Sequence, residues 1–128
     1  MSNDVVECAK KLPALVNGNE RLLWRGRMVT LELMLGLGEL PCRLVIERGR
    51  IVDVICGPTL LRPWRFALRG PLESWRRHWE PMPAPHFHDL FAMSKRGHLV
   101  IEGDIQPLMA NLFYFKDVLA APRKKAVQ

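Results

Sequence analysis

The chain lacks the sequence features that mark most exported and membrane-spanning proteins. Among its 128 residues no apolar run reaches the roughly 18 that a membrane-spanning helix needs, because Glu32 and Glu39 interrupt the best candidate. The first seven residues are acidic, whereas an export signal would be basic. We therefore expect a cytoplasmic protein that does not cross a membrane.

Cysteine is scarce, and its spacing indicates no metal site. Cys8, Cys42 and Cys56 have neither Cys-x-x-Cys nor metal-ligand spacing, so we expect reduced thiols. The run His86-Phe87-His88-Asp89 could chelate a metal on a strand, but on a helix its two histidines diverge by about 200°. We interpret this run as the start of a helix with exposed histidines and predict no metal site.

Catalytic and cofactor-binding motifs are also missing. Ser74 and Ser94 lie in segments with helical patterns, outside any Gly-x-Ser-x-Gly context. Gly36 and Gly38 lack the third glycine and the following helix of a dinucleotide-binding loop. Asp104 has no partner base and is better explained as a helix cap. We therefore expect a protein that is not an enzyme and binds no cofactor.

Positive charge is the unusual feature of the composition. The formal net charge is +6, the pI is about 9.7, and 13 of the 19 cationic residues are arginines. This charge suits partners that carry phosphate, either nucleic acid or anionic lipid headgroups, but it also suits a solubilising surface. Aromatic residues alternate with arginine in Trp64-Arg65-Phe66, and this alternation places the aromatics in the core rather than against bases.

Hydrophobic periodicity predicts a helix and then a strand in the first third of the chain. Residues 3–17 have helical spacing, with a break or kink at Pro13 and a left-handed end at Gly18. Residues 29–35 alternate with period 2, which predicts a strand, and a loop follows over residues 36–41. The residues predicted to face the core here are Val5, Ala9, Leu12, Val16, Leu31, Leu33 and Leu35.

A hairpin follows, and its register can be argued from which residues prefer water. A two-residue turn at Arg48-Gly49 would place Asp53 on the buried face. A three-residue loop at 47–49 avoids this, and we predict that loop. Its pairs are Leu44 with Val52 and Cys42 with Val54, with Arg43, Glu47 and Asp53 outward and both Cys42 and Cys56 as small buried residues.

In the second half of the chain, hydrophobic periodicity predicts a further strand, two helices, a strand and a final helix. In order, these are a proline-rich crossover at 58–63, a strand at 64–69, a helix between Pro71 and Pro81, a helix at 86–96, a strand at 99–102 and a final helix after Asp104. We predict one α+β domain over residues 1–128, with its core at about 20–121 and a basic tail at 122–128.

One run of sequence carries a family resemblance. It reads Asp-Leu-Phe-Ala-Met-Ser-Lys-Arg-Gly-His-Leu-Val-Ile-Glu-Gly-Asp-Ile over residues 89–105, with Leu108-Met109-Ala110 after it. The pattern is a helix that ends at basic residues and a glycine, a short apolar strand that ends in Glu-Gly-Asp, and a further helix. Over residues 89–120 this pattern resembles the sterol carrier protein 2 family. The predicted order of elements is also the family's order.

The resemblance implies a mostly antiparallel five-stranded sheet covered on one face by helices, in the order α-β-β-β-crossover-β-α-α-β-α. An apolar tunnel between sheet and helices would hold a sterol, a fatty acyl chain or an isoprenoid. The implied function is a non-enzymatic lipid carrier. The alternative is an accessory subunit that presents a hydrophobic intermediate to an enzyme, as some bacterial members do in ubiquinone biosynthesis. A basic nucleic-acid-binding adaptor is the third hypothesis.

The resemblance also implies partners and a tunnel wall. The partners would be a hydrophobic small molecule, an anionic membrane in transient contact and a lipid-modifying enzyme, with no nucleic acid expected. The final residues lack a peroxisomal address, and the proline-rich stretches 58–64 and 79–87 are long enough to fill or reshape a tunnel. Combining the resemblance with the strand alternation, the predicted wall is Leu31, Leu33, Leu44, Ile46, Val52, Val54, Phe66, Leu68, Phe91, Leu99, Ile101, Leu108, Met109, Leu112 and Phe115.

Overall fold

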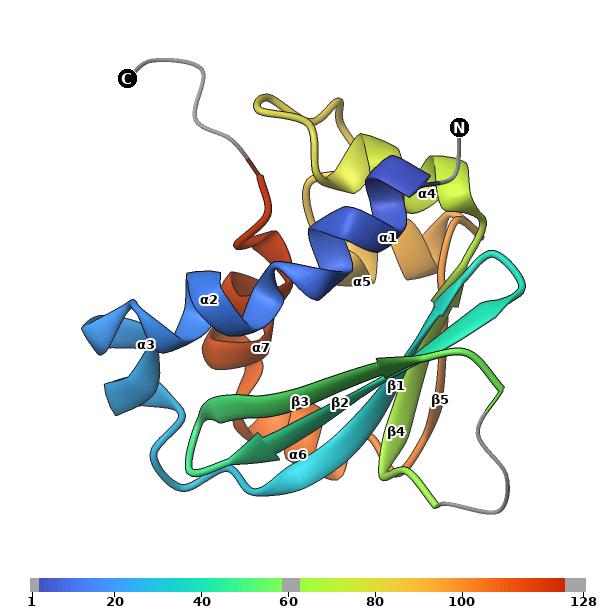
Figure 1. The fold of residues 1–128 in the computed structure, drawn as a ribbon. Coiled ribbons are helices and arrows are strands. Elements are labelled where there is room, and N and C mark those ends of the chain that lie inside the picture. The colour runs from blue at the N-terminus through green and yellow to red at the C-terminus, as the bar shows by residue number, and fades with distance from the viewer. Residues whose placement is uncertain (1–2, 59–62, 124–128) are drawn as a thin grey trace.

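Five strands form one sheet, and the helices lie over one of its faces (Figure 1). The structure is a computed structural model that describes residues 3–58 and 63–123, so most of the predicted crossover and basic tail lie outside the described residues. The strands are β1 (Leu31–Leu37), β2 (Leu40–Glu47), β3 (Arg50–Cys56), β4 (Phe66–Gly70) and β5 (Val100–Gly103). Their order in the sheet is β3-β2-β1-β4-β5.

The sheet is mixed, because one of its four strand pairs is parallel. β1 pairs with β4 in parallel, whereas β1 with β2, β2 with β3 and β4 with β5 are antiparallel. A parallel pair requires the chain to cross from one end of the sheet to the other, which the connection between β3 and β4 does. The mostly antiparallel α+β fold predicted from the sequence is therefore confirmed.

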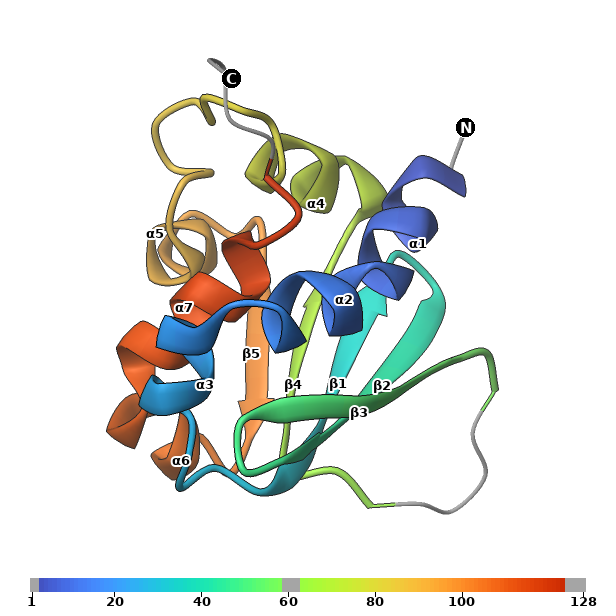
Figure 2. The same cartoon turned by 60° about the vertical axis from the view of Figure 1, so that its left-hand side comes forward.

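Seven helices of the described residues form the second layer. They are α1 (Asn3–Lys10), α2 (Leu12–Asn17), α3 (Glu20–Arg25), α4 (Leu72–His78), α5 (Leu90–Lys95), α6 (Gln106–Ala110) and α7 (Leu112–Ala120). The turned view in Figure 2 shows α3, α5, α6 and α7 together on one side, with α1 and α2 running across the sheet. None of the helices within the described ranges is long and apolar enough to cross a membrane.

The core lies between the sheet and the helices, and the predicted inward faces meet there. The apolar stripe of α1 and α2, formed by Val5, Ala9, Leu12 and Val16, is at most 2% exposed, as are Leu33 and Leu35 of β1. Leu31 is partly buried against the same cluster. Because helical and strand periodicity both direct these residues to one side, the sequence predicts this core correctly.

The register predicted for the hairpin is wrong. β2 and β3 are joined by a two-residue turn at Arg48 and Gly49, both with positive φ, and Glu47 pairs with Arg50. A bulge then shifts the register, so that Val52 has no partner and Asp53 lies opposite Val45 on the outer face. Without the bulge, a two-residue turn would place Asp53 on the buried face. The bulge places Asp53 on the solvent-exposed face instead, so the two-residue turn is compatible with its charge.

The shifted register also changes the interpretation of the cysteines. Leu44 pairs with Val54 rather than Val52, and Cys42 pairs with Cys56 rather than Val54. The two cysteine side chains form a disulfide across β2 and β3, so the expectation of three reduced thiols is wrong. Cys8 is partly buried and belongs to no disulfide.

Local capping corrects the boundaries of several predicted helices. The chain between residues 18 and 26 forms α3, which the sequence analysis missed, with the Asn19 side chain accepting a hydrogen bond from Leu22 N–H at 3.2 Å. Gly18 has φ −86°, so it is not left-handed as predicted. The helix predicted at 86–96 begins only at Leu90, because Asp89 caps it and His86 has a positive φ.

Two further boundaries differ at the ends of predicted elements. Gly36 and Pro41 lie within β1 and β2 rather than in a loop. The final helix is broken into α6 and α7 at Asn111, whose side-chain amide donates to the Pro107 carbonyl at 3.0 Å. Asp104 does not cap α6 as its N-cap residue, although its carboxylate accepts from Gln106 N–H at 3.2 Å.

Candidate functional site

The predicted tunnel wall largely coincides with the apolar interior between sheet and helices. Eight of its residues are at most 2% exposed. Four more are partly buried against the same cluster, and Leu112 is half-buried beside it. The fully buried residues are Leu33, Leu44, Ile46, Phe66, Leu68, Leu99, Leu108 and Phe115, and the four partly buried ones are Leu31, Val54, Phe91 and Ile101.

Two predicted wall residues do not face this interior. Val52 is 51% exposed because the β3 bulge leaves it outside the strand alternation, and Ile51 takes the buried position beside it. Met109 is also 51% exposed, since the break at Asn111 separates the short helix α6 from the apolar face of α7. Neither residue belongs to the buried interior.

Aromatic side chains pack on one another within the interior. Phe66 of β4 and Phe115 of α7 meet edge to face, with ring centroids 5.3 Å apart. Trp75 and Trp79 of α4 pack with centroids 5.4 Å apart. The Phe66–Phe115 contact joins the sheet directly to the helical layer.

Three buried aromatic side chains donate to backbone carbonyls, two of them in the sheet and its hairpin and one in α7. Trp75 Nε1 donates to the Gly36 carbonyl of β1 at 3.0 Å. Trp79 Nε1 donates to the Leu119 carbonyl of α7 at 2.6 Å, and the Tyr114 hydroxyl donates to the Gly49 carbonyl at 2.6 Å. Burial raises the pKa of Tyr114 well above its ordinary value, so the phenol stays a donor.

His78 is a polar side chain buried in this otherwise apolar layer, and the sequence analysis did not identify it. It is 1% exposed, and its Nδ1 lies 2.7 Å from the Phe87 carbonyl oxygen. Burial lowers the pKa of His78 to about 4, helped by the nearby charge of Arg123. Its three-residue spacing from Trp75 on one helix face is the sequence signal that could have placed it in the interior.

His86 and His88, the two histidines considered above as metal ligands, lie outside the buried interior. His86 and His88 are exposed in the segment before α5, while Phe87 between them packs against the core and stacks on His98. Within residues 3–58 and 63–123 no three histidine, cysteine, aspartate or glutamate side chains are grouped so that they could hold a metal ion.

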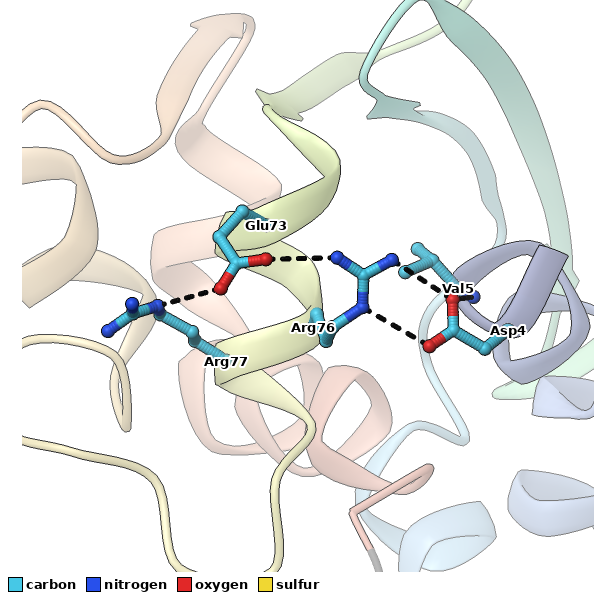
Figure 3. Close-up of polar contacts among 5 residues, drawn as sticks. All are labelled: Asp4, Val5, Glu73, Arg76 and Arg77. Carbon is cyan, nitrogen blue, oxygen red and sulfur yellow. Dashed lines mark hydrogen bonds and ion pairs between the residues drawn. The ribbon is translucent and has the colours of Figure 1, made fainter. Parts of the chain in front are cut away.

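A network of charged side chains joins the N-terminal helix to α4 (Figure 3). Arg76 donates to both carboxylate oxygens of Asp4, at 3.1 and 3.2 Å, and to Glu73 at 2.9 Å, and Arg77 donates to the other Glu73 oxygen at 3.0 Å. These hydrogen bonds lower the pKa of both Asp4 and Glu73. A surface pocket of about 230 Å³ lies beside the network, between α1 and the end of α4.

Several arginines on the outer face of the sheet are paired with carboxylates. Arg43, predicted to face water, is 1% exposed and donates to Glu32 at 2.7 Å and to the Pro63 carbonyl at 2.8 Å. Arg69 is paired with Glu102, and Arg65 lies 3.8 Å from Asp104. Most of the positive charge on this face is therefore matched by carboxylates.

Three strongly exposed apolar side chains lie on or beside α3 and α7, two helices that contact each other. Trp24 is 64% exposed, Met28 84% and Phe113 72%. The ring of Tyr114, next to Phe113, packs on Gly26, and Figure 2 shows α3 beside α7. Arg27 stacks over the Trp24 ring at 3.5 Å. We call Trp24, Met28 and Phe113 the apolar end.

These features together define an α+β fold in which a mixed five-stranded sheet and one layer of helices enclose an apolar interior. This is the fold of sterol carrier protein 2: its crystal structure matches 94% of this chain and 96% of its own, with a TM-score of 0.72 at 14% sequence identity. The resemblance noted in residues 89–120 is therefore confirmed at the level of the fold.

Two other solved structures share the fold. One is a conserved hypothetical protein from Thermus thermophilus, named as a candidate sterol carrier protein, with TM-score 0.65 and 12% identity over 94% of this chain and 89% of its own. The other is the UbiJ-SCP2 ubiquinone synthesis protein, with TM-score 0.61 and 15% identity over 90% of this chain and 94% of its own. No protein-family model and no curated protein sequence matches the chain.

Proposed function

We propose that this protein is a non-enzymatic lipid carrier that holds a sterol, a fatty acyl chain or an isoprenoid between its sheet and its helices. The observation that carries the proposal is the match to sterol carrier protein 2 over nearly the whole chain. The buried wall residues support it, because they are apolar side chains from both layers and contribute no catalytic group.

Ligand entry would open the boundary between the two layers. The helices pack on the sheet mainly through apolar side chains. A lipid chain offers similar apolar contacts, so replacing some of these contacts by lipid would cost little free energy. The hydrogen bonds from Trp75 and Tyr114 hold the helical layer at a few points. A bound lipid would lie between these points of attachment.

The test is a search for bound lipid followed by a displacement assay. Native mass spectrometry of protein purified from cells, with extraction and identification of lipid, should show a hydrophobic molecule at up to one per chain. The purified protein should also bind a fluorescent fatty acid and release it to competing lipids. Absence of co-purified lipid together with absence of fluorophore binding would overturn the proposal.

Two valines on β3 provide a matched pair of variants for this assay. Val54 packs against the interior, whereas Val52 on the same strand is exposed. Val54→Trp should lower fluorophore affinity several-fold because the indole occupies ligand space, and Val52→Trp should leave it unchanged. Equal affinity in the two variants would place the ligand outside the interior.

A second function is supported by the likeness to the UbiJ-SCP2 ubiquinone synthesis protein. In that case the protein would present a hydrophobic intermediate to an enzyme as an accessory subunit. It would bind ligand in the same interior but would also form a stable complex. Recovery of the same lipid-modifying enzyme in affinity purifications at low and high salt supports this function, and recovery of none supports an independent carrier.

We also infer transient contact with anionic membranes through the apolar end. Tryptophan and phenylalanine side chains insert at the level of lipid headgroups, and Arg21, Arg25 and Arg27 on and after α3 supply cations beside them. Arg25 is partly neutralised by Asp117 at 2.6 Å, so the expected attraction is weak and reversible. A carrier that loads from a bilayer requires contact of this reversible kind.

A further inference from the structure

The imidazole of His78 has one nitrogen with a hydrogen-bond partner and one without. Nδ1 lies 2.7 Å from the Phe87 carbonyl oxygen. Nε2 is buried and has no hydrogen-bond partner within the described part of the chain. This contrasts with the indoles of Trp75 and Trp79 on the same helix, which both reach a backbone carbonyl. An unpaired buried polar atom destabilises a folded protein, so a native example needs an explanation.

The contact with Phe87 determines which kind of partner Nε2 needs. A carbonyl oxygen accepts only, so Nδ1 at 2.7 Å from it must carry the proton. Arg123 approaches Nδ1 at 3.4 Å and also bonds the His78 and His88 carbonyls, and its positive charge opposes a second proton on the ring. In a neutral imidazole with the proton on Nδ1, Nε2 is an acceptor. Its missing partner is therefore a donor.

His78 lies at the boundary of the proposed lipid-binding interior. Trp75, one turn earlier on α4, belongs to the buried core, and its ring meets the imidazole edge to face at a centroid distance of 6.3 Å. Phe87, which holds Nδ1, packs against the same core. Since Nδ1 is directed at Phe87, Nε2 on the other edge of the ring is directed away from it, inside the protein.

We propose that His78 Nε2 accepts a hydrogen bond from the hydroxyl group of an alcohol or phenol at the polar end of the bound lipid. This inference rests on the proposed carrier function and narrows its ligand class. Esters, ethers and hydrocarbons have no donor to offer, so they would leave Nε2 unpaired in the complex. A hydroxyl-bearing ligand satisfies it and is favoured over its methyl ether by one hydrogen bond.

The test compares ligands that differ only in that donor. The probes are 4-nonylphenol against 4-nonylanisole and cholesterol against cholesteryl methyl ether, each competing with a fluorescent fatty acid for the full chain. We expect the phenol and the sterol to bind about three- to tenfold more tightly than their ethers, the value of one net hydrogen bond. Equal affinity within both pairs would overturn the inference and leave the carrier function intact.

Two substitutions at position 78 assign the effect to Nε2. The amide of His78→Asn lies near the position of Nδ1 and can still donate to Phe87, but it places no acceptor where Nε2 was. His78→Gln can place an acceptor there. The Asn variant should bind the hydroxyl ligands no more tightly than their ethers, with its affinity for the ethers unchanged. The Gln variant should retain part of the preference for the hydroxyl ligands. A full preference in the Asn variant would contradict the proposal.

A measurement on the unsubstituted protein covers the case in which a variant does not fold. The ¹⁵N chemical shift of His78 Nε2 should move on addition of 4-nonylphenol and stay unchanged on addition of 4-nonylanisole. An equal change of the chemical shift with both ligands would show that it does not come from the hydroxyl and would contradict the proposal. If none of the four probes displaces the fluorophore, the carrier function fails and this inference fails with it.

Discussion

His78 makes the stability of the fold depend on pH in a window where few other groups titrate. Its folded-state pKa of about 4 lies below the ordinary value of 6.5 because burial opposes the charged form. The unfolded chain therefore binds more protons between these values, and stability is lost as the pH falls from about 6.5 to 4. The loss should approach about 3 kcal/mol, since each pKa unit is worth about 1.4 kcal/mol.

Urea unfolding at intervals between pH 7 and 4 measures this loss. Arg123, Asp89 and His88 face the imidazole, and of these Arg123 and His88 oppose its protonation whereas Asp89 favours it. His78→Asn should flatten the stability profile over the same range, because no titrating group then remains at the position. An unchanged slope in that variant would assign the loss to other groups.

The disulfide between Cys42 and Cys56 gives a second prediction at the level of single residues. The bridge closes a loop with a sequence separation of 14 residues, and loops of this length contribute about 3 kcal/mol by restricting the unfolded chain. Reductant should therefore lower the midpoint of urea unfolding, and Cys42→Ser with Cys56→Ser should make the midpoint insensitive to reductant. Three reactive thiols per denatured chain without reductant, rather than one, would contradict the bridge.

At the level of elements, a contact between glycine and tyrosine holds α3, the β2–β3 hairpin and α7 together. A Cβ atom on Gly26 would collide with the ring of Tyr114, whose hydroxyl in turn donates to Gly49. Gly26→Ala should therefore destabilise the fold by about 1 to 3 kcal/mol, as overpacking does elsewhere. Gly18→Ala is the comparison, because its φ is −86° and its Cβ would lie 3.2 Å from the Ala14 carbonyl oxygen, a close contact but a far milder one than at Gly26.

Thermal unfolding of the two alanine variants decides this prediction. The Gly18 variant should differ from the unsubstituted chain by less than about 1 kcal/mol. Tyr114→Phe separates the hydrogen bond from the packing, and it should cost about 1 to 3 kcal/mol because it leaves the buried Gly49 carbonyl unpaired. Equal stability of all three variants would mean that α3 packs independently of α7.

The type of an element could be predicted from the sequence where hydrophobic periodicity extends over many residues. The boundaries of the elements could not. The alternation through Leu31, Leu33 and Leu35 and the stripe from Val5 to Val16 place these residues correctly, because burial of one face is all that either pattern encodes. α3 was missed although Asn19 and Gly26 bracket it, because its six residues are too few for a periodic signal. The hairpin register failed because a single unpaired residue, Val52, has no sequence signature.

The candidate site was predictable only as a set of apolar residues. Thirteen of the fifteen predicted wall residues are buried or partly buried, since core and tunnel wall share one sequence pattern. Their role in lipid binding stays a prediction. The spacing of His78 from Trp75 could have indicated its burial, but not its contacts with Phe87, nine residues later, and with Arg123, 45 residues later.

At the level of the whole molecule, the apolar end predicts binding to anionic bilayers. The unsubstituted protein should sediment with phosphatidylcholine vesicles that contain phosphatidylglycerol and should be released by salt, because the electrostatic part of the attraction is screened. Trp24→Ala with Phe113→Ala should reduce the bound fraction several-fold, since both exposed rings are removed.

A matched control exists in other parts of the surface. Met82 and Val100 are 79% and 54% exposed and lie outside the apolar end. Met82→Ala with Val100→Ala should therefore leave vesicle binding unchanged. An equal decrease of the vesicle-bound fraction in the two double variants would indicate non-specific adhesion. Equal binding to uncharged vesicles would show that electrostatic attraction does not contribute.

The bulge at Val52 has a consequence for how the protein behaves in a crowded solution. β3 is an edge strand, and unpaired backbone groups on such an edge let a strand of another molecule add. On this edge the N–H and C=O of Ile51 are already bonded by the Asn17 side chain, at 2.9 Å each. The bulge interrupts this row of groups and twists the strand, while Arg50 and Asp53 place charges along it. The same irregularity that shifts the register of the hairpin thus protects the sheet from growing by aggregation.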